Sequence, residues 1–470
     1  MPETAPKLRA SGRTSEVERL AQFVQRASYG DLSTAAREAL KIRVLDSLGC
    51  AIGALGADLM SVVRRQVVEF GGSPLCSLIG GGRTAPDRAA FMNGALVRHL
   101  DFMDAYLARG ETCHPSDNLA PVLAAAEYAD ADGAGLMTAL AVAYQVQARL
   151  SDEAPVRDRG FDHTTQGAFA VGAGVAKALG LDAEQMAHAI ALAAVGNVAL
   201  RVTRTGDLSH WKGLAFPNTA FMGVHAAFLA MRGVTGPLEV FEGVKGFKES
   251  VSGPFSIDWA AEDLERVCRT IVKKYDAEVH AQSAVHAALA LRARHGFTAA
   301  DVARVEVEIF EVAYHIIGGG AEGDKTLVAT KEQADHSLPY MVAAALCDGV
   351  LMPAQYAPER IARDDVQDLL RRVTVRPDQA FSARFPDEMP CRVAIWLKDG
   401  ARVAMEARDY PGFHTRAASW EHAVEKFNAL ASPLISSNSC EAIVKAVAGL
   451  EELAVHDLTA AVARPMERAH

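Results

Sequence analysis

The sequence predicts a mainly α-helical protein, in which a large all-α domain carries an inserted, smaller α+β domain. From Ser15 to about Thr270, apolar residues recur at three- and four-residue spacing with few β-branched runs, which indicates helices. Alternating patterns typical of strands begin only at about residue 302, and the helical period returns near the C-terminus. A run of strands bounded by helical segments on both sides indicates an insertion.

The first domain shows two clear helical segments. Residues 43–55, RVLDSLGCAIGAL, have the helical period. Asp182 and Gln185 form a plausible capping box for LDAEQMAHAIALAAVGNVAL, which is apolar nearly all round and so indicates a central, buried helix. The many Ala and Gly residues of this segment permit close helix packing.

Strand signals mark the inserted domain. ARVEVEIF alternates from about residue 302, RRVTVRP (371–377) does the same, and CRVAIWLKDGARVAMEA predicts a hairpin that turns on Asp399-Gly400. From Ser419 the helical period returns in SWEHAVEKFNAL and SCEAIVKAVAGLEEL, so we expect the C-terminus to pack on the first domain. The expected boundaries are 1–270 plus 406–470 for the helical domain and 271–405 for the α+β domain.

Composition restricts the possible functions. The chain has 470 residues, 50% of them hydrophobic and 23% charged, which suits two domains with a large core. Its net charge of -10 and the lack of a basic run argue against a nucleic-acid surface. An acidic small substrate therefore needs a local cationic pocket.

The sequence also bears on the cellular compartment. No apolar stretch reaches the length of a membrane helix without a charge or glycine, and residues 1–15 lack a signal-peptide core. We therefore expect a cytoplasmic protein that does not bind membranes. Seven scattered cysteines without a CxxC pair argue against disulfides, structural zinc and iron–sulfur clusters.

The most informative segment is a polar run between apolar, alanine-rich flanks, NGALVRHLDFMDAYLARGETCHPSDN (93–118). Its Asp101, Asp104, His114, Asp117 and Asn118 offer a base, an acid and several hydrogen-bonding groups. The run therefore favours chemistry. A polar loop whose residues 114–117 cap the following helix is the structural alternative.

Several segments together resemble the MmgE/PrpD family along nearly the whole chain. They are LDSLGCAIGAL, NGALVRHLDFMDA with HPSDN, GFDHTTQGAFAVGAGVAKALGL, WKGLAFPNTAF, KKYDAEVHAQSAVHAA, ADHSLPYMVAAAL and SWEHAVEKF. The resemblance implies a large helical domain, a smaller α/β lid, a homodimer and a reaction on a di- or tricarboxylate without metal or organic cofactor. HPSDN and DAEVHAQSAV look more like the 2-methylcitrate dehydratase branch than the cis-aconitate decarboxylase branch.

Two departures concern the substrate. The family often has Lys-x-Tyr-Pro where this chain has an aspartate, Asp276, in place of the proline, and the acid would alter the charge of the pocket. The dehydratase branch commonly has an Asn-Asp-Thr-Trp run where this chain reads HLDFMDAY (99–106).

Removing water from a β-hydroxy carboxylate requires a base, an acid and cations that stabilise the developing charge. His114 and His163 are the best candidates for proton transfer, because each lies in a polar segment that enters a helix. Asp101 would orient a histidine. Core histidines and a solvated aspartate are the structural alternatives.

Other candidates are cations and residues of the second domain. Lys212 resembles the family's lysine for a substrate carboxylate, and Arg201 and Lys273 are weaker candidates because Arg204 and Lys274 beside them suggest solvated charge. His280 lies in the segment that joins the two domains and residues 335–340 lie in the lid, so we expect both to close over a ligand held by the helical domain. The remaining candidates are Tyr340 as a proton donor, with a core tyrosine as the alternative, and Ser116 and His336 for substrate binding.

Four hypotheses remain open at this point. A hydro-lyase acting on 2-methylcitrate or a close tricarboxylate is preferred over cis-aconitate decarboxylation or an iminodisuccinate-type epimerisation on the same scaffold. A metal-dependent hydrolase would use His99, Asp101, Asp104 and His114, or Asp335-His336, but the spacing fits poorly. A non-catalytic scaffold would not explain the recurring polar runs. A Cys113 nucleophile is disfavoured because adjacent side chains seldom form a catalytic pair.

Overall fold

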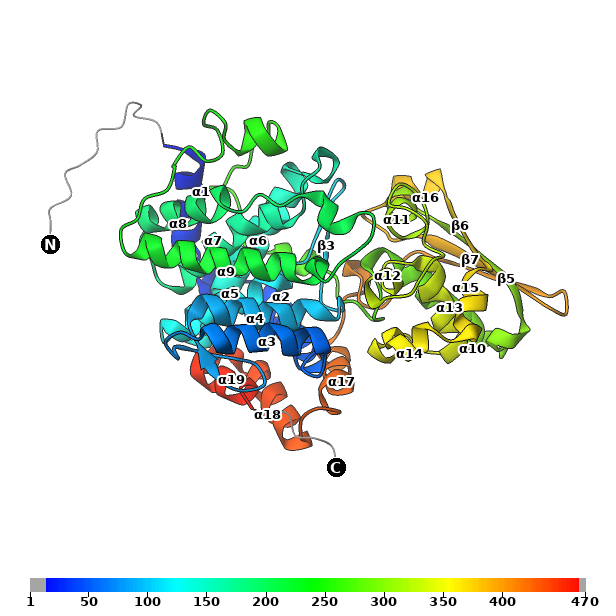
Figure 1. The fold of residues 1–470 in the computed structure, drawn as a ribbon. Coiled ribbons are helices and arrows are strands. Elements are labelled where there is room, and N and C mark those ends of the chain that lie inside the picture. Colours follow the sequence, from blue (N-terminus) through cyan, green and yellow to red (C-terminus); the bar gives the residue numbers. More distant parts are fainter. Residues whose placement is uncertain (1–13, 465–470) are drawn as a thin grey trace.

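The computed structural model describes residues 14–464, so residues 1–15, considered above for a signal peptide, lie almost entirely outside the described part. The chain forms a large helical part and a smaller part in which helices pack on a sheet (Figure 1). Each part has its own hydrophobic core, and the second core draws mainly on residues 271–413. The prediction of a mainly α-helical protein is confirmed.

The helical part consists of a bundle and three C-terminal helices. Its bounds are α1 Glu16–Arg26, α2 Thr34–Gly53, α3 Asp58–Phe70, α4 Pro86–His99, α5 Leu119–Tyr128, α6 Gly133–Glu153, α7 Thr164–Ala178, α8 Ala183–Val195, α9 Trp211–Met231, α17 Trp420–Ala431, α18 Ser437–Ala448 and α19 Val455–Val462. Helix α17 packs on α2, where Lys426 pairs with buried Asp46 at 2.7 Å. The predicted return of the C-terminus to the helical part is confirmed.

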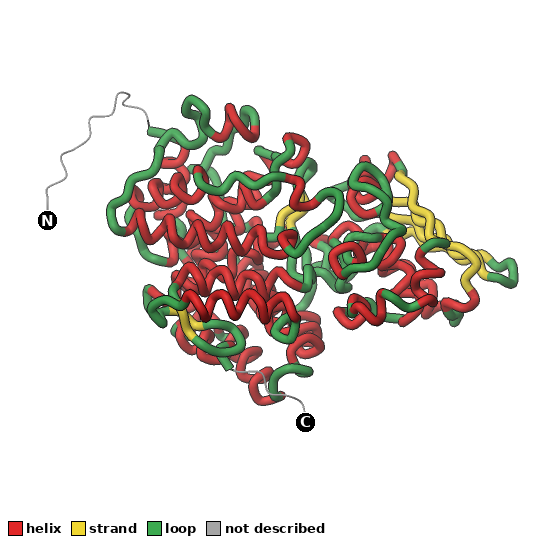
Figure 2. The backbone as a smooth tube through the Cα atoms, viewed as in Figure 1, coloured by secondary structure: helices red, strands yellow, loops and turns green. Residues whose placement is uncertain are grey.

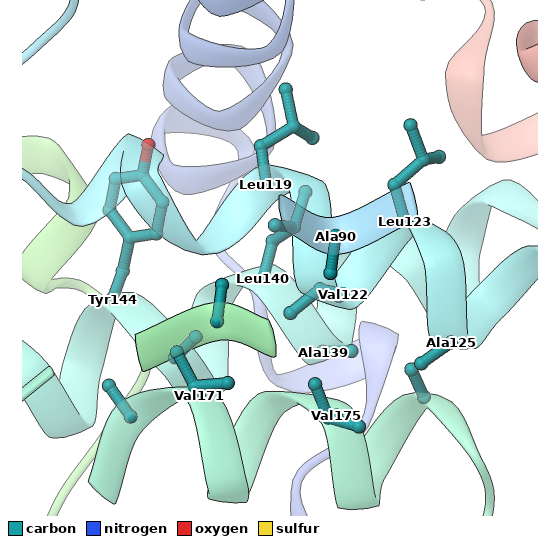
Figure 3. Close-up of a cluster of buried hydrophobic side chains, with 14 of the residues drawn as sticks. Ala90, Leu119, Val122, Leu123, Ala125, Ala139, Leu140, Tyr144, Val171 and Val175 are labelled. Carbon is teal, nitrogen blue, oxygen red and sulfur yellow. The ribbon is translucent and has the colours of Figure 1, made fainter. Parts of the chain in front are cut away.

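Helix α7 lies at the centre of the bundle, against α5, α6, α8 and α9. Small residues permit this packing: a Cβ atom on Gly174 would lie 2.9 Å from the side chains of Ala143 and Val122. Figure 3 shows the side chains of Val122, Leu140 and Val171 meeting in this core. Helix α8 begins with the predicted capping box, in which the Asp182 carboxylate accepts a hydrogen bond from the Gln185 amide at 2.9 Å.

The expectation of helices up to Thr270 is partly wrong. Regular α-helix ends at Met231, and residues 232–270 are mostly loops with short turns of π- and 3₁₀-helix. Two small hairpins also interrupt the helical part: β1 Cys76–Ser77 with β2 Arg83–Thr84, and β3 Tyr106–Leu107 with β4 Thr112–Cys113. The second hairpin lies within the polar run at 93–118 and reverses the chain before α5 begins.

The smaller part contains one four-stranded sheet in the order β6-β5-β7-β8. Its elements are α10 Gln282–His295, β5 Val302–Ile309, α11 Glu311–Ile317, α12 Lys331–Ala334, α13 Leu338–Asp348, α14 Pro358–Ile361, α15 Asp364–Leu370, β6 Val373–Pro377, α16 Gln379–Arg384, β7 Cys391–Leu397 and β8 Arg402–Ala407. Strands β5 and β6 are parallel and the other pairs antiparallel. All three strand predictions are confirmed, including the turn at Asp399-Gly400.

Helices α10 and α13 pack on the sheet and lie between it and the helical part (Figure 2). The smaller part thus presents helices and loops, and not strands, to the bundle.

Helix α9 is long and apolar enough to cross a membrane by length and composition alone. In the structure its window is 61% buried, and it packs on α4, α7 and α8. These contacts identify it as a core helix of the bundle. Its N-terminal turn holds Lys212 at the boundary with the smaller part.

Candidate active site

A narrow cavity lies where the two parts of the molecule meet. The end of α4, the β4 strand and the N-terminus of α7 contribute residues from the helical part, together with the 3₁₀-helices η3 Arg157–Arg159 and η4 Arg201–Arg204. Its lining consists of Arg98, Asp101, Thr112, His114, Arg157, His163, Arg201, Arg204, Lys273, Glu278, His280, Ile316, Glu322 and His336. Five cationic side chains face three carboxylates, so the cationic pocket that an acidic substrate requires is present.

Asp101 is at the centre of the charged groups. Helix α4 ends two residues before it, and its φ of 58° places it in the left-handed region that aspartate tolerates. Its Oδ1 lies 2.5 Å from Arg98 Nη1 and 3.0 Å from Lys273 Nζ. Burial would raise the pKa of Asp101, but the charges of Arg98 and Lys273 hold it well below its usual range. The carboxylate is therefore a fixed anion between cations.

Lys212 connects the two parts of the molecule. Its ammonium lies 2.7 Å from Asp335 Oδ1, 3.3 Å from Asp101 Oδ2 and 2.9 Å from His336 Nδ1. The same Nδ1 atom also lies 2.9 Å from Asp335 Oδ1, so His336 contacts both the ammonium and the carboxylate. Among the described residues, Asp101, Asp335 and His336 form the one group spaced to hold a metal ion, and the Lys212 ammonium bonds to all three.

His114 has a defined tautomer. Its Nδ1 donates to the carbonyl of Asp104 at 2.9 Å, which leaves the lone pair on Nε2. Burial, followed by the charges of Arg98 and Lys273, holds the pKa of His114 well below its usual range. The capping alternative for this segment is wrong, because neither His114 nor Asn118 makes a side-chain cap bond at the helix that follows it.

Asp104 supports this loop without facing the cavity. Its carboxylate accepts hydrogen bonds from the Ser116 amide at 3.0 Å and the Tyr144 hydroxyl at 2.9 Å. These bonds and the Asp104 carbonyl together hold the imidazole of His114 in place.

His163 packs edge-on against His114, with the ring centroids 5.5 Å apart. Its Nε2 lies 3.2 Å from Arg204 Nη2, which donates to it. Burial lowers the pKa of His163 to about 3, so the ring is neutral. The lone pair of this histidine is therefore already used by Arg204.

A carboxylate does hold a histidine in this cavity, but the pair is Glu278 with His280 and does not involve Asp101. Its Nδ1 lies 2.8 Å from Glu278 Oε1, and its Nε2 lies 3.5 Å from Thr112 Oγ1. Burial would raise the pKa of Glu278, but the charge of His280 and its hydrogen bond lower it to about 2. Within residues 14–464, Asp101 makes no hydrogen bond to a histidine.

Three candidates from the sequence, Tyr340, Ser116 and Lys212, do not line this cavity. The Tyr340 hydroxyl donates to the carbonyl of Gln355 inside the core of the smaller part. Ser116 is fully buried behind His114, where its amide bonds to Asp104. Lys212 lines a neighbouring cavity that shares Arg98 and Asp101 with the first and also contains His99.

The solvated alternative for Arg201 and Lys273 is wrong. Lys273 is completely buried, and the side chain of Arg201 is 14% exposed. Asp276 is also buried, and burial raises its pKa to about 7, but it does not line the cavity.

Sequence reasoning missed several lining residues, namely Arg98, Thr112, Arg157, Arg204, Glu278 and Glu322. Arg98 had a usable signal, because it precedes Asp101 by three residues in the last turn of a helix and its charge complements the C-terminal dipole. Glu278 likewise precedes His280 by two residues. Arg157 and Glu322 had no such signal, since only tertiary folding brings them to the cavity.

The fold and this site define a class of protein: a helical bundle joined to an α/β part, with histidines and cations in a cavity between them. Models of two domains match the chain, the MmgE/PrpD N-terminal domain over residues 18–260 and the MmgE/PrpD C-terminal domain over residues 275–452. The chain therefore belongs to the MmgE/PrpD family.

Proteins that are similar to this chain are named as two kinds of lyase, 2-methylcitrate dehydratase and cis-aconitate decarboxylase. The chain is 32% identical to the 2-methylcitrate dehydratase of Escherichia coli strain K12 over 79% of this chain and 81% of that protein. It is 31% identical to the 2-methylcitrate dehydratase of Cupriavidus necator over 82% and 83%. It is 28% identical to the cis-aconitate decarboxylase of Mus musculus over 88% and 86%.

Proposed function

We propose that the protein is a cofactor-independent hydro-lyase that dehydrates 2-methylcitrate or a closely related tricarboxylate by general acid/base catalysis. The observation that supports this best is that His114 and His280 line the same cation-rich cavity with different partners at Nδ1. The partner of His114 is a carbonyl, and that of His280 is a carboxylate. The similarity to named 2-methylcitrate dehydratases supports the substrate class.

His114 is the proposed base. His114 lines the cavity with its lone pair on Nε2, and burial together with the charges of Arg98 and Lys273 keeps the ring neutral. A bound substrate brings carboxylates that offset these cations, so the basicity of His114 rises when the substrate arrives. In the reaction, Nε2 removes the proton from the carbon beside a carboxylate, and the electron pair left behind forms the new carbon–carbon double bond.

His280 is the proposed acid. The Glu278 carboxylate at 2.8 Å stabilises the imidazolium, in which Nε2 carries a proton that faces the cavity. This proton goes to the hydroxyl as its bond to carbon breaks, so that water leaves. Placing two titratable groups in opposite electrostatic environments is a general way to assign an acid and a base.

The remaining candidates bind the substrate. His336 offers its imidazole, and Arg201 and Lys273 are cations for carboxylates. Lys212 holds Asp335 and His336 of the smaller part against Asp101 of the helical part. Because its ammonium occupies the centre of the carboxylate and imidazole groups, we propose that these residues work without a metal ion.

Further proposals follow from the family resemblance. The α/β part would act as a lid inserted between residues 270 and 406, and the protein would be a cytoplasmic homodimer. Lys212 and the Arg201–Glu322 ion pair, which both cross the boundary, support a closing motion of the lid.

A second candidate function is cis-aconitate decarboxylation, which the similarity to the mouse enzyme favours. It would use the same cations, with carbon dioxide leaving in place of water. An iminodisuccinate-type epimerisation would require only proton removal and return.

The products distinguish these reactions. Chelator-treated protein is incubated in deuterated water with 2-methylcitrate, citrate, cis-aconitate and racemic iminodisuccinate, and products are followed by NMR. We expect an alkene from 2-methylcitrate, with no requirement for added metal. Carbon dioxide from cis-aconitate, or deuterium exchange without alkene, would instead assign the decarboxylase or the epimerase.

A further inference from the structure

One ion pair in the lining of the cavity crosses the boundary between the two parts. Arg201 of η4 lies 2.8 Å from the Oε1 atom of Glu322, and both side chains line the cavity. Their side chains are 14% and 12% exposed, so the pair lies at the edge of the cavity. The arginine belongs to the helical part and the glutamate to the smaller part.

Glu322 lies on a glycine-rich loop that follows α11. Gly319 and Gly323 have φ of 100° and 97°, a region that other residues avoid, so the loop turns sharply on either side of the glutamate. The loop is tied back to α11 by the Glu322 amide, which donates to the His315 carbonyl at 3.0 Å. The side chain is therefore presented to the cavity by a loop that carries little apolar surface.

Glu322 differs from the other carboxylates that pair with cavity cations. Asp162 pairs with Arg204 at 2.8 Å and also accepts the Thr164 amide. Glu111, which pairs with Arg157, accepts the amides of Val156 and Arg157. These two carboxylates are held by backbone bonds of the helical part.

Asp101 is likewise held, by three cations at once. Glu322 has a single ion-pair partner among the described residues, and its Oε2 atom is buried without a hydrogen bond. Arg201 is thus the cavity cation whose counter-ion is most easily replaced.

We propose that Glu322 is an internal stand-in for a substrate carboxylate on Arg201. The third carboxylate of a tricarboxylate exchanges with Glu322, so that Arg201 favours tricarboxylates over dicarboxylates while Glu322 competes with them. The inference rests on the proposed function. A ligand with two carboxylates binds the deeper cations and leaves the Arg201–Glu322 pair closed. A ligand with a third carboxylate displaces the side chain of Glu322, which turns into solvent.

The exchange has a measurable consequence for affinity. Because the ligand competes with an internal carboxylate, removing that charge strengthens the binding of a tricarboxylate and does not change that of a dicarboxylate. Replacing Arg201 weakens the binding of the tricarboxylate and leaves that of the dicarboxylate unchanged. With Arg201 absent, the loss of Glu322 has no further effect, because the competition no longer exists.

Calorimetric titration tests this with propane-1,2,3-tricarboxylate and glutarate, neither of which has a hydroxyl group to lose. The variants are Glu322→Gln, Arg201→Gln, the double variant, and Glu359→Gln as a control, since Glu359 is an exposed carboxylate of the same part. We expect Glu322→Gln to bind the tricarboxylate about tenfold more tightly, the range of one favourable ion pair. Glutarate affinity and the control should stay within about twofold.

Unchanged or weaker tricarboxylate binding by Glu322→Gln, or an equal gain for glutarate, would overturn the inference while leaving the proposed function intact. A wild-type protein that binds neither ligand would overturn both the polycarboxylate function and the inference. The Glu322→Gln result stands without the Arg201 variants, so a folding defect in those would not prevent a decision.

Discussion

Two histidines of the cavity, His114 and His280, differ in the group that accepts the hydrogen bond of Nδ1. His114 has a carbonyl behind Nδ1 and cations nearby, which oppose its protonation. His280 has the carboxylate of Glu278 behind Nδ1, which favours it. The same side chain is thereby suited to opposite steps of an elimination.

Glu278→Gln tests the role of this carboxylate. The amide retains an acceptor for His280 but no longer stabilises the imidazolium. We expect kcat to fall about 10- to 100-fold, with the alkaline limb of the pH–rate profile moving to lower pH because the acid loses its proton more easily. The profile is measured between pH 5 and 9 beside Glu359→Gln. A lower rate with an unchanged profile would assign Glu278 a structural role only.

The sequence located much of the site but not its electrostatics. Polar segments before helices pointed to His114 and His163, and the segment between the two domains pointed to His280. The structure brings all three to one cavity. Tyr340 also lies at the start of a helix, α13, but this helix is buried in the core of the smaller part. The Tyr340 hydroxyl donates its hydrogen bond within that core. Which counter-ion each residue meets depends on segments far apart in the chain, and one sequence does not specify that.

At the scale of elements, close packing of α7 on α8 depends on glycine. A Cβ atom on Gly172 would lie 2.9 Å from the Cα atom of Ile190, which is backbone and cannot rotate away. Gly196 has no φ strain and its nearest neighbour would be at 3.7 Å. The first position is crowded and the second is open.

Gly172→Ala should therefore destabilise the protein by about 1 to 3 kcal/mol, because overpacking outweighs the gain in helix propensity. Gly196→Ala, the same substitution in an open position, should change stability by less than about 0.5 kcal/mol. Urea unfolding of both variants measures the difference. Equal effects would contradict the packing account of α7.

Elements with a strong period were predicted well, and those fixed by tertiary contacts were not. The alternation in β5 and the capping box of α8 are local signals, and both were read correctly. Residues 232–270 contain apolar side chains such as Phe241 and Trp259 that insert into the bundle from loops. Their spacing resembles that of a helix, although packing and not periodicity determines the conformation.

At the scale of the whole molecule, two carboxyl groups near the charged cavity are buried without a hydrogen bond within the described residues. Asp117 and Asp276 are 3% and 1% exposed, and within the described residues no carboxyl oxygen of either accepts a hydrogen bond. Burial raises the pKa of each to about 7. The folded protein therefore holds two protons that the unfolded chain releases near pH 4.

This linkage predicts a dependence of stability on pH. Between about pH 4 and pH 7 the folded state binds more protons, so each group lowers the free energy of unfolding as pH rises, by up to a few kcal/mol. Asp276→Asn removes the ionisation, so its stability relative to wild type should increase from pH 5 to pH 8. Urea unfolding at both values measures this, with exposed Asp364→Asn as control. A difference that does not change with pH would contradict the raised pKa.

The central claim is that His114 and His280 act as base and acid in one cavity. The most direct measurement is the turnover of 2-methylcitrate by chelator-treated wild type, His114→Gln, His280→Gln and His225→Gln, the last an exposed histidine of α9. The account predicts that each cavity variant unfolds at the wild-type temperature while kcat falls about 10²- to 10⁴-fold, with the control unaffected. Turnover within about threefold of wild type in either folded cavity variant would contradict it.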